Sequence, residues 1–96
     1  MKKVFKYPIS LCEPYIKEIY APQIFEPLCV KIQQGTPFLW ALVDPDTPET
    51  IHYIRVSGTG NEIREDIAKY IDTFQMHGGS LFVHAFLLRR QPEASA

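Results

Sequence analysis

The sequence has few cysteines, almost no charge imbalance and no long apolar run. Its two cysteines, Cys12 and Cys29, are too few for the disulfide framework of a small secreted domain, and we expect them to stay reduced, a disulfide between them being the alternative. The net charge is −1, so the sequence lacks the basic excess typical of general nucleic-acid binding or of attraction to anionic membranes. The longest apolar run, residues 38–43, is far shorter than the ~20 residues of a membrane span.

Length and composition are those of one ordinary globular domain. The chain has 96 residues, of which 46% are hydrophobic and 22% charged, enough for one hydrophobic core and too few for two. We expect a single β domain over residues 1–90 and a frayed tail at residues 91–96, where the apolar pattern ends. The N-terminus lacks the apolar stretch of a signal peptide, so we expect a cytoplasmic protein.

Short segments that alternate between polar and apolar residues, separated by proline or glycine, dominate the chain. This pattern predicts β-strands joined by turns. The seven expected strands are residues 3–7, 15–21, 28–33, 38–43, 51–57, 70–76 and 80–88. Residues 28–33 and 38–43 should form a hairpin that 51–57 extends into a meander. Residues 38–43 are apolar on both faces and should form the central strand, whereas 15–21 should lie at an edge or against a mixed surface.

One stretch, residues 62–69, has helical spacing. Ile63 and Ile67 lie four apart, and Asn61 is suited to cap a helix that has acidic residues in its first turn. A segment this short can hold about two turns at most. The expected fold is therefore all-β, or β-rich α+β: an antiparallel β-sandwich or partly open barrel of about seven short strands with one short helical turn.

The large apolar side chains divide into an expected core and an expected surface. Alternation predicts that Leu28, Val30 and Ile32 cover the core. The aromatic residues expected in the core are Phe38, Trp40, Phe74, Phe82 and Phe86. Four tyrosines lie in strands whose two faces both mix polar and apolar residues, and such tyrosines suit a protein interface. They are Tyr15, Tyr20, Tyr53 and Tyr70. Exposed sheet edges in so small a domain also favour pairing with a second copy, so we expect a homo-oligomer, in the simplest case a dimer.

Two glycine-containing loops could present backbone amides to an anion. The first loop is Gly58, Thr59, Gly60 and Asn61, just before the expected helical turn, where free amides favour negative charge. The second is His77, Gly78 and Gly79, which also predicts a hairpin turn. Arg55 and Arg64 could add positive charge. The predicted ligand is a phosphate-bearing metabolite or signalling nucleotide, and the alternative is that both loops are only turns.

Histidines and cysteines do not predict a metal or catalytic site. The three histidines and two cysteines lack the close spacing of a zinc site. No nucleophile-elbow, Walker or metalloprotease motif is present. We therefore expect no cofactor, no metal and no catalytic residue. A small hydrolase is the enzymatic alternative, and it would need a histidine beside Cys29, Ser57 or Asp72.

Four segments carry a resemblance to known proteins. They are Lys3-Val4-Phe5-Lys6-Tyr7, residues 35–45 with their Trp-Ala-Leu-Val-Asp-Pro block, residues 58–60, and residues 73–84 with their Phe-Gln-Met-His-Gly-Gly block. Between Lys3 and Phe86 the chain resembles a family of small uncharacterised proteins encoded by bacteriophages and prophages. The resemblance implies location in the cytoplasm of a bacterial host cell and provides no activity or catalytic residues.

Small phage proteins of this size are often accessory factors that bind and block host machinery. The resemblance therefore implies a binding protein without catalysis whose partner is a host protein, for example a component of a defence system that it inhibits. A binder that sequesters an anionic metabolite or signalling nucleotide is the alternative from another class. The first hypothesis rests on an association between proteins of similar size and setting, since fold and size do not determine function. The second rests on the two glycine-containing loops.

Overall fold

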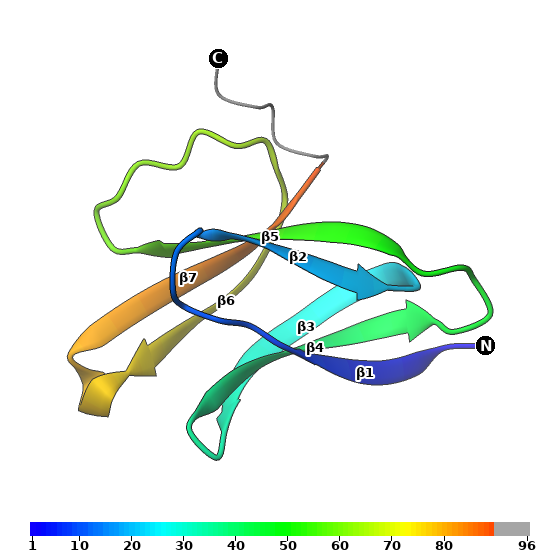
Figure 1. Ribbon diagram of the computed structural model, residues 1–96, viewed down its shortest axis with the longest axis horizontal. Helices are drawn as coiled ribbons and strands as arrows, with labels where there is room; N and C mark the ends of the chain where they lie inside the picture. Colours follow the sequence, from blue (N-terminus) through cyan, green and yellow to red (C-terminus); the bar gives the residue numbers. More distant parts are fainter. Residues whose placement is uncertain (90–96) are drawn as a thin grey trace.

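The computed structural model describes residues 1–89, which form seven antiparallel β-strands in two sheets (Figure 1). The strands are β1 (Lys3–Pro8), β2 (Ile16–Ala21), β3 (Gln23–Gln33), β4 (Thr36–Asp44), β5 (Thr50–Gly58), β6 (Ile67–Met76) and β7 (Leu81–Leu88), with one 3₁₀ turn, η1 (His77–Gly79). One sheet has the order β1-β4-β3 and the other β2-β5-β7-β6. The predicted all-β fold of about seven strands is confirmed. The tail predicted at residues 91–96 lies outside the described residues.

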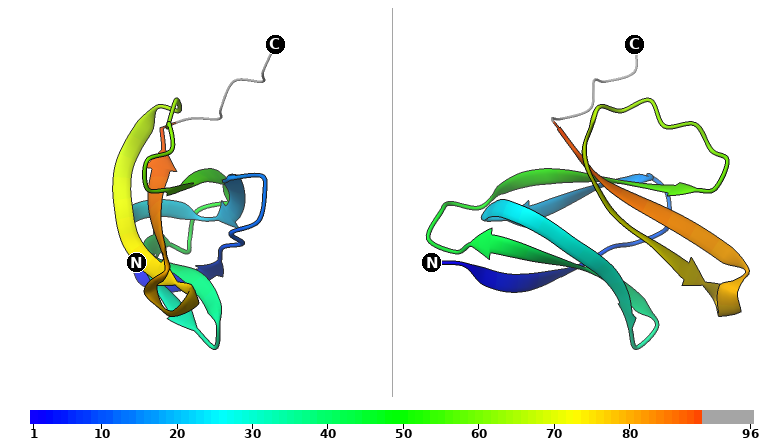
Figure 2. Two further views of the ribbon diagram at one scale, coloured as in Figure 1. Left: turned by 90° about the vertical axis from the view of Figure 1, so that its left-hand side faces the viewer. Right: turned by 180° about the vertical axis from the view of Figure 1, so that it is seen from behind.

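The two sheets pack face to face around a common core (Figure 2). The chain passes from one sheet to the other at Pro22, between β2 and β3. On one side the edge strands β3 and β6 meet, and the backbone N–H of Val30 donates a hydrogen bond to Asp72 Oδ2 at 2.9 Å. A side chain takes the place of a backbone ladder between these edges, so the fold is a sandwich partly closed along one side.

Buried residues alternate along the strands as a two-layered β-fold requires. In β4, Leu39, Ala41 and Val43 are buried, and the residues between them are half-buried. In the opposite sheet, Ile54 and Val56 of β5 are among the residues that pack into the same core. β4 is the middle strand of its sheet and β2 is an edge strand, which confirms both predicted positions.

Residues 62–69 contain no helix, so the predicted helical turn is wrong. Residues 61–66 form an irregular loop, and β6 begins at Ile67. Arg55 Nη2 donates a hydrogen bond to the Glu62 carbonyl oxygen at 3.1 Å, and the Arg89 N–H donates to the Asp66 carbonyl oxygen at 2.9 Å. The loop carbonyls thus bond to β5 and to the residue that follows β7, and a helix of about two turns has too little stability of its own to compete.

The predicted meander is also wrong, although its first hairpin is confirmed. β3 and β4 pair through a tight turn at Gln34 and Gly35, but β5 pairs with β2 and β7 in the other sheet. The connection between β4 and β5 contains Pro45 and Pro48, and these residues lack the N–H groups that a tight hairpin would use. This connection leads the chain into the second layer instead.

Several residues predicted to lie in the core are at the surface. Of the three residues of β3 predicted to cover the core, only Val30 is buried, whereas Leu28 and Ile32 are exposed. Register shifts between Ile24 and Cys29 break the alternation at Leu28, and Ile32 lies near the end of the strand, beside the turn to β4. Phe82 is exposed as well. Phe74 is buried as predicted, and Phe38, Trp40 and Phe86 are half-buried. Phe38, Trp40 and Phe86 alternate along their strands with fully buried residues such as Ala41 and Ala85, and so point outward.

Candidate functional site

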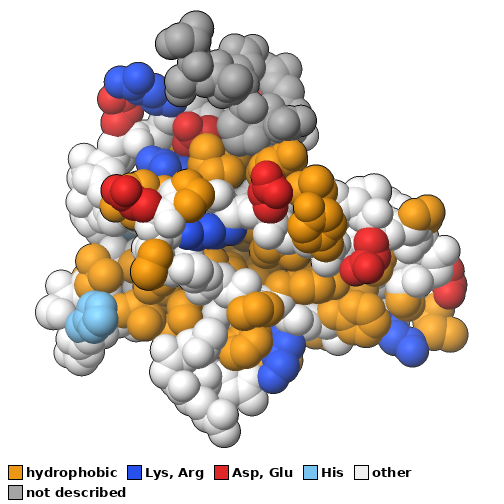
Figure 3. Space-filling view, viewed as in Figure 1, with side chains coloured by type: hydrophobic (Ala, Val, Ile, Leu, Met, Phe, Trp, Pro, Cys, Tyr) orange, Lys and Arg blue, Asp and Glu red, His pale blue; other side chains and the backbone are white. Residues whose placement is uncertain are grey.

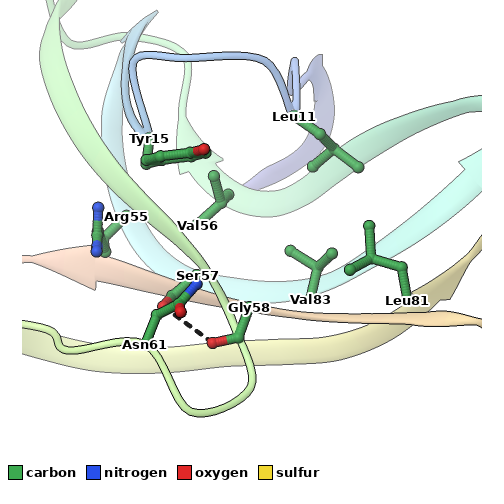
Figure 4. Close-up of a pocket in the computed structure, with 9 residues that line it drawn as sticks. All are labelled: Leu11, Tyr15, Arg55, Val56, Ser57, Gly58, Asn61, Leu81 and Val83. Atoms are coloured by element: carbon green, nitrogen blue, oxygen red, sulfur yellow. Dashed lines mark hydrogen bonds between the residues drawn. The ribbon is translucent and has the colours of Figure 1, made fainter.

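A pocket of about 410 Å³ lies at one end of the four-stranded sheet (Figure 4). Its apolar wall consists of Leu11, Val56, Leu81 and Val83, and the ring of Tyr15 lies on one side. Its polar end contains Arg55, Ser57 and Asn61, and Gly58 lies between the two parts. The volume is within the range of ~300–1,000 Å³ typical of small-molecule sites.

Glycine at position 58 lets the loop after β5 fold back on the strand end. The Asn61 N–H donates a hydrogen bond to the Gly58 carbonyl oxygen at 3.2 Å (Figure 4). A Cβ added at Gly58 would lie 3.1 Å from Asn61 Nδ2, and Gly60 between them has a φ of 90°. This tight turn therefore brings the Asn61 carboxamide to the edge of the pocket.

The charge of Arg55 is balanced within the protein. Its Nε lies 3.1 Å from Glu65 Oε1, and the two side chains are only 15% and 21% exposed. The contact is ionic, because neither atom has a partner with hydrogen-bond geometry in the described chain. The guanidinium also lies 5.9 Å from the centroid of the Tyr15 ring. Arg55 thus connects the loop at residues 59–66 to the strand, and Glu65 neutralises it.

The structure brings together only part of the predicted ligand site. Arg55, Gly58 and Asn61 line the pocket, and Thr59 and Gly60 belong to the same turn. Arg64 is exposed and forms an ion pair with Glu62, its Nε lying 3.1 Å from Glu62 Oε1. The second loop of His77, Gly78 and Gly79 forms the turn between β6 and β7 and does not line the pocket.

The pocket wall contains residues that sequence reasoning did not assign to a ligand site. Leu11 and Val83 are far apart in the chain; Leu11 lies between two strands, and ordinary alternation explains Val83 as a core residue. They meet because the Tyr15 carbonyl accepts a hydrogen bond from the Val56 N–H at 2.9 Å, and Gly58 of β5 pairs with Val83 of β7. No local signal in the sequence contains these pairings.

Three of the four predicted interface tyrosines share the outer face of the four-stranded sheet. Tyr20 lies opposite Ile51, and Tyr53 follows two residues later on the same face of β5. Tyr70 lies opposite Phe86, and their ring centroids are 5.8 Å apart at an angle of 60°. We call this surface the outer aromatic face, and its members are Tyr20, Ile51, Tyr53, Tyr70, Phe82 and Phe86. The fourth tyrosine, Tyr15, lies at the pocket instead.

His84 of β7 is held between two threonine hydroxyls. Its Nε2 lies 2.7 Å from Thr59 Oγ1, and its Nδ1 lies 2.9 Å from Thr73 Oγ1, which also accepts a hydrogen bond from the Tyr70 hydroxyl. Ser57 is the cross-strand neighbour of His84, but its hydroxyl donates to the Gly58 carbonyl oxygen. Within residues 1–89, none of the three nucleophiles considered for a hydrolase is hydrogen-bonded to a histidine.

The described part of the chain contains no group of three His, Cys, Asp or Glu side chains that could hold a metal ion. Cys12 is exposed and Cys29 half-buried, and both are free thiols. None of the helical segments in residues 1–89 is long and apolar enough to cross a membrane.

Comparison with known proteins assigns the chain to a family. A family profile described as Domain of unknown function (DUF7352) matches residues 1–95. No curated protein matches the sequence, and no solved structure matches the fold. The profile covers nearly the full length of 96 residues, including both sheets, the pocket and the outer aromatic face. The chain therefore belongs to the DUF7352 family of domains of unknown function.

Proposed function

We propose that this protein acts without catalysis, by binding another protein through the outer aromatic face. One observation carries the proposal: Tyr20, Tyr70 and Phe82 are 61%, 52% and 45% exposed on the same side of one sheet. Monomeric soluble proteins rarely leave contiguous apolar surface exposed without a function. Aromatic residues are enriched in protein interfaces and are common among the residues that dominate binding energy.

The chemistry around these rings also suits an interface. Figure 3 is viewed from the opposite side, that of the β1–β2 connection, and shows hydrophobic side chains with charged groups scattered among them there as well. Arg55, which lies beside the outer aromatic face, is already paired with Glu65. A partner that covers this face therefore does not have to strip water from a free arginine charge, which would oppose binding.

The outer aromatic face is ordered before any partner arrives. Its strands are joined by antiparallel pairing, and the Tyr70 hydroxyl is held by a hydrogen bond to Thr73 Oγ1 at 2.8 Å. A tyrosine fixed in this way loses little conformational freedom on binding. The resemblance to phage and prophage proteins supports a host protein as the partner. We propose that this partner is a component of a host defence system, which the protein inhibits.

The proposal is tested by affinity capture with exposed-residue variants. Tagged wild-type protein, Tyr20→Ser and Tyr70→Ser would be incubated with host lysate, and bound proteins quantified by mass spectrometry. The matched controls are Val4→Ser and Ile32→Ser, which alter exposed apolar residues of the other sheet. A partner recovered with wild type and controls, but reduced at least tenfold with both tyrosine variants, supports the proposal. Equal recovery with all five proteins contradicts it.

Light scattering on the same proteins tests the expected dimer. One chain has a mass of 11.1 kDa, so a dimer would have about twice that mass. A dimer that dissociates in Tyr20→Ser and Tyr70→Ser, but not in the controls, identifies a second copy as the partner of the outer aromatic face. A monomer at every concentration contradicts the expected homo-oligomer and leaves the face free for a different protein.

A further inference from the structure

We propose that the pocket between the β1–β2 connection, β5 and β7 binds a small uncharged ligand with an apolar body and one neutral polar group. This inference is tested separately from the proposed protein binding, because the apolar wall of the pocket faces inward and neither Tyr20 nor Tyr70 lines the pocket; only Arg55, at its polar end, borders the outer aromatic face. Its basis is the volume, the wall and the charge balance of the pocket.

The volume is the first argument. Protein interiors are packed as densely as organic crystals, and the few voids they contain rarely exceed one water molecule. The pocket has about 410 Å³ and is partly open to solvent, so it is a cleft much larger than such a void. It therefore matches a small organic molecule in size.

The wall defines the body of the ligand. Leu11, Val83 and the ring of Tyr15 point toward a common space in Figure 4. Leu81 lies on the same side and is 39% exposed, which is unusual for a leucine on the inward side of a strand. An apolar group that filled this space would remove these side chains from water at ~25 cal/mol per Å² of apolar surface.

The charge balance excludes a strongly anionic ligand. Arg55 is the cation at the polar end, and it is engaged by Glu65 at 3.1 Å and by the Glu62 carbonyl oxygen at 3.1 Å. An anion beside Arg55 would also face the negative charge of Glu65, so the attraction of one group is offset by the repulsion of the other. This is why we infer an uncharged ligand, although the sequence pattern predicted a phosphate.

Neutral hydrogen-bonding groups remain at the polar end. Among residues 1–89, the Asn61 carboxamide makes no hydrogen bond within the protein, and the Ser57 hydroxyl uses only its hydrogen, in a long contact of 3.3 Å to the Gly58 carbonyl oxygen. A carboxamide both donates and accepts, and a hydroxyl oxygen accepts. An alcohol, amide or carbonyl group on the ligand fits this pair.

The experiment compares two fluorescent probes that share one aromatic body. N-phenyl-1-naphthylamine is uncharged, and its 8-sulfonate, anilinonaphthalene sulfonate, has the same rings and a negative charge. We expect the uncharged probe to saturate at one per chain and to bind at least tenfold more tightly than the sulfonate. Tighter binding of the sulfonate that is lost in Arg55→Met would overturn the proposal in favour of an anion site.

Neighbouring residues of β7 provide the matched variants. Leu81→Trp places a larger side chain in the pocket, whereas Phe82→Trp adds the same side chain on the opposite face of the same strand. We expect Leu81→Trp to weaken binding of the uncharged probe at least tenfold and Phe82→Trp to leave it unchanged. Leu11→Trp blocks the pocket from the loop and provides a second blocking variant should Leu81→Trp disturb the strand.

Circular dichroism and a thermal melt identify any variant that fails to fold. Probe binding that does not saturate in the wild type, or that survives in every folded blocking variant, overturns the proposal. Failure of the protein-binding proposal would appear separately, as equal partner recovery with the Tyr20→Ser and Tyr70→Ser variants, since neither residue lines the pocket.

Discussion

Asp72 of β6 accepts a hydrogen bond from the backbone N–H of Val30 of β3, with Oδ2 2.9 Å from the nitrogen. This contact joins the edge strands of two different sheets, where no backbone ladder forms. Asp72 Oδ1 also accepts from the Thr73 N–H at 2.9 Å. Both carboxylate oxygens are therefore used, and one residue helps to hold the two layers together.

Replacing this carboxylate should destabilise the protein. In Asp72→Ala the partly buried Val30 N–H loses its acceptor, and we expect the free energy of unfolding to fall by about 1–3 kcal/mol. Urea denaturation measures the loss. Asp46→Ala is the control, because Asp46 is exposed and its ion pair with the N-terminus at 3.8 Å should contribute little. Equal stability of both variants would show that the contact between β3 and β6 is dispensable.

Two arginine–glutamate ion pairs involve the loop at residues 59–66, and they should differ in strength. Arg55 and Glu65 are 15% and 21% exposed, whereas Arg64 and Glu62 are 80% and 70% exposed, and both pairs have N–O distances of 3.1 Å. A double-mutant cycle should give a coupling energy of about 1–2 kcal/mol for the first pair and near zero for the second, because solvent screens the exposed charges. Equal coupling in both pairs would contradict the role of Arg55 as the anchor of the loop.

The hydrogen bond between Thr59 and His84 should hold the loop against the sheet. Thr59→Val keeps the shape of the side chain but removes the hydroxyl that lies 2.7 Å from His84 Nε2. We expect faster amide hydrogen exchange in residues 59–66, because the free energy of local opening falls when such contacts are lost. Exchange in the β3–β4 hairpin should not change. Uniformly faster exchange throughout the chain would indicate global destabilisation instead.

Tyr7 should make the free energy of unfolding depend on pH in the alkaline range. Burial, followed by the nearby Glu49 carboxylate, raises the pKa of Tyr7 above its ordinary value of 10.0. The phenol is neutral when protonated, so its contribution to folding is constant below pH 10, the unfolded pKa, and is lost as pH rises through the higher folded pKa. Urea midpoints of wild type and Tyr7→Phe should therefore diverge only above about pH 10.

The same variant has a second expected effect at neutral pH. The Tyr7 hydroxyl is buried and has no hydrogen-bond partner among the described residues. Its removal in Tyr7→Phe should leave stability unchanged or raise it by about 1 kcal/mol, because an unsatisfied polar group opposes burial. Tyr20→Phe, at an exposed position, should follow the wild-type pH curve. A large loss of stability in Tyr7→Phe would show that the hydroxyl has a partner after all.

Local patterns were sufficient to predict the strands and many of the turns. Alternation and proline or glycine breaks located all seven strands, including the inward alternation of β4 from Leu39 to Val43. The turn at His77 to Gly79 was also predictable, because Gly78 and Gly79 have φ values of 67° and 91°, which glycine adopts without strain. The helix predicted from the spacing of Ile63 and Ile67 was wrong, because the carbonyls of this loop bond to residues outside it instead.

The candidate site was predictable only in part. Arg55, Gly58 and Asn61 were recognised because charge and glycine turns are visible in a short stretch of sequence. The neutralising Glu65 and the packing of Tyr15 against Arg55 were not, since both depend on where the loop and the β1–β2 connection fold back. These contacts are the reason why we propose an uncharged ligand where the sequence pattern predicted an anion.

The sequence by itself determined that this is a seven-stranded β protein, because the period of two and the turn residues are properties of neighbouring positions. Only the tertiary structure decided how the strands are ordered. Tyr20 and Tyr70 share one face because of the registers in which β2, β5, β7 and β6 pair, and Leu11 meets Val83 where the β1–β2 connection lies over β7. Pairing between distant strands depends on the packing of the whole core, and no local stretch of sequence contains that information.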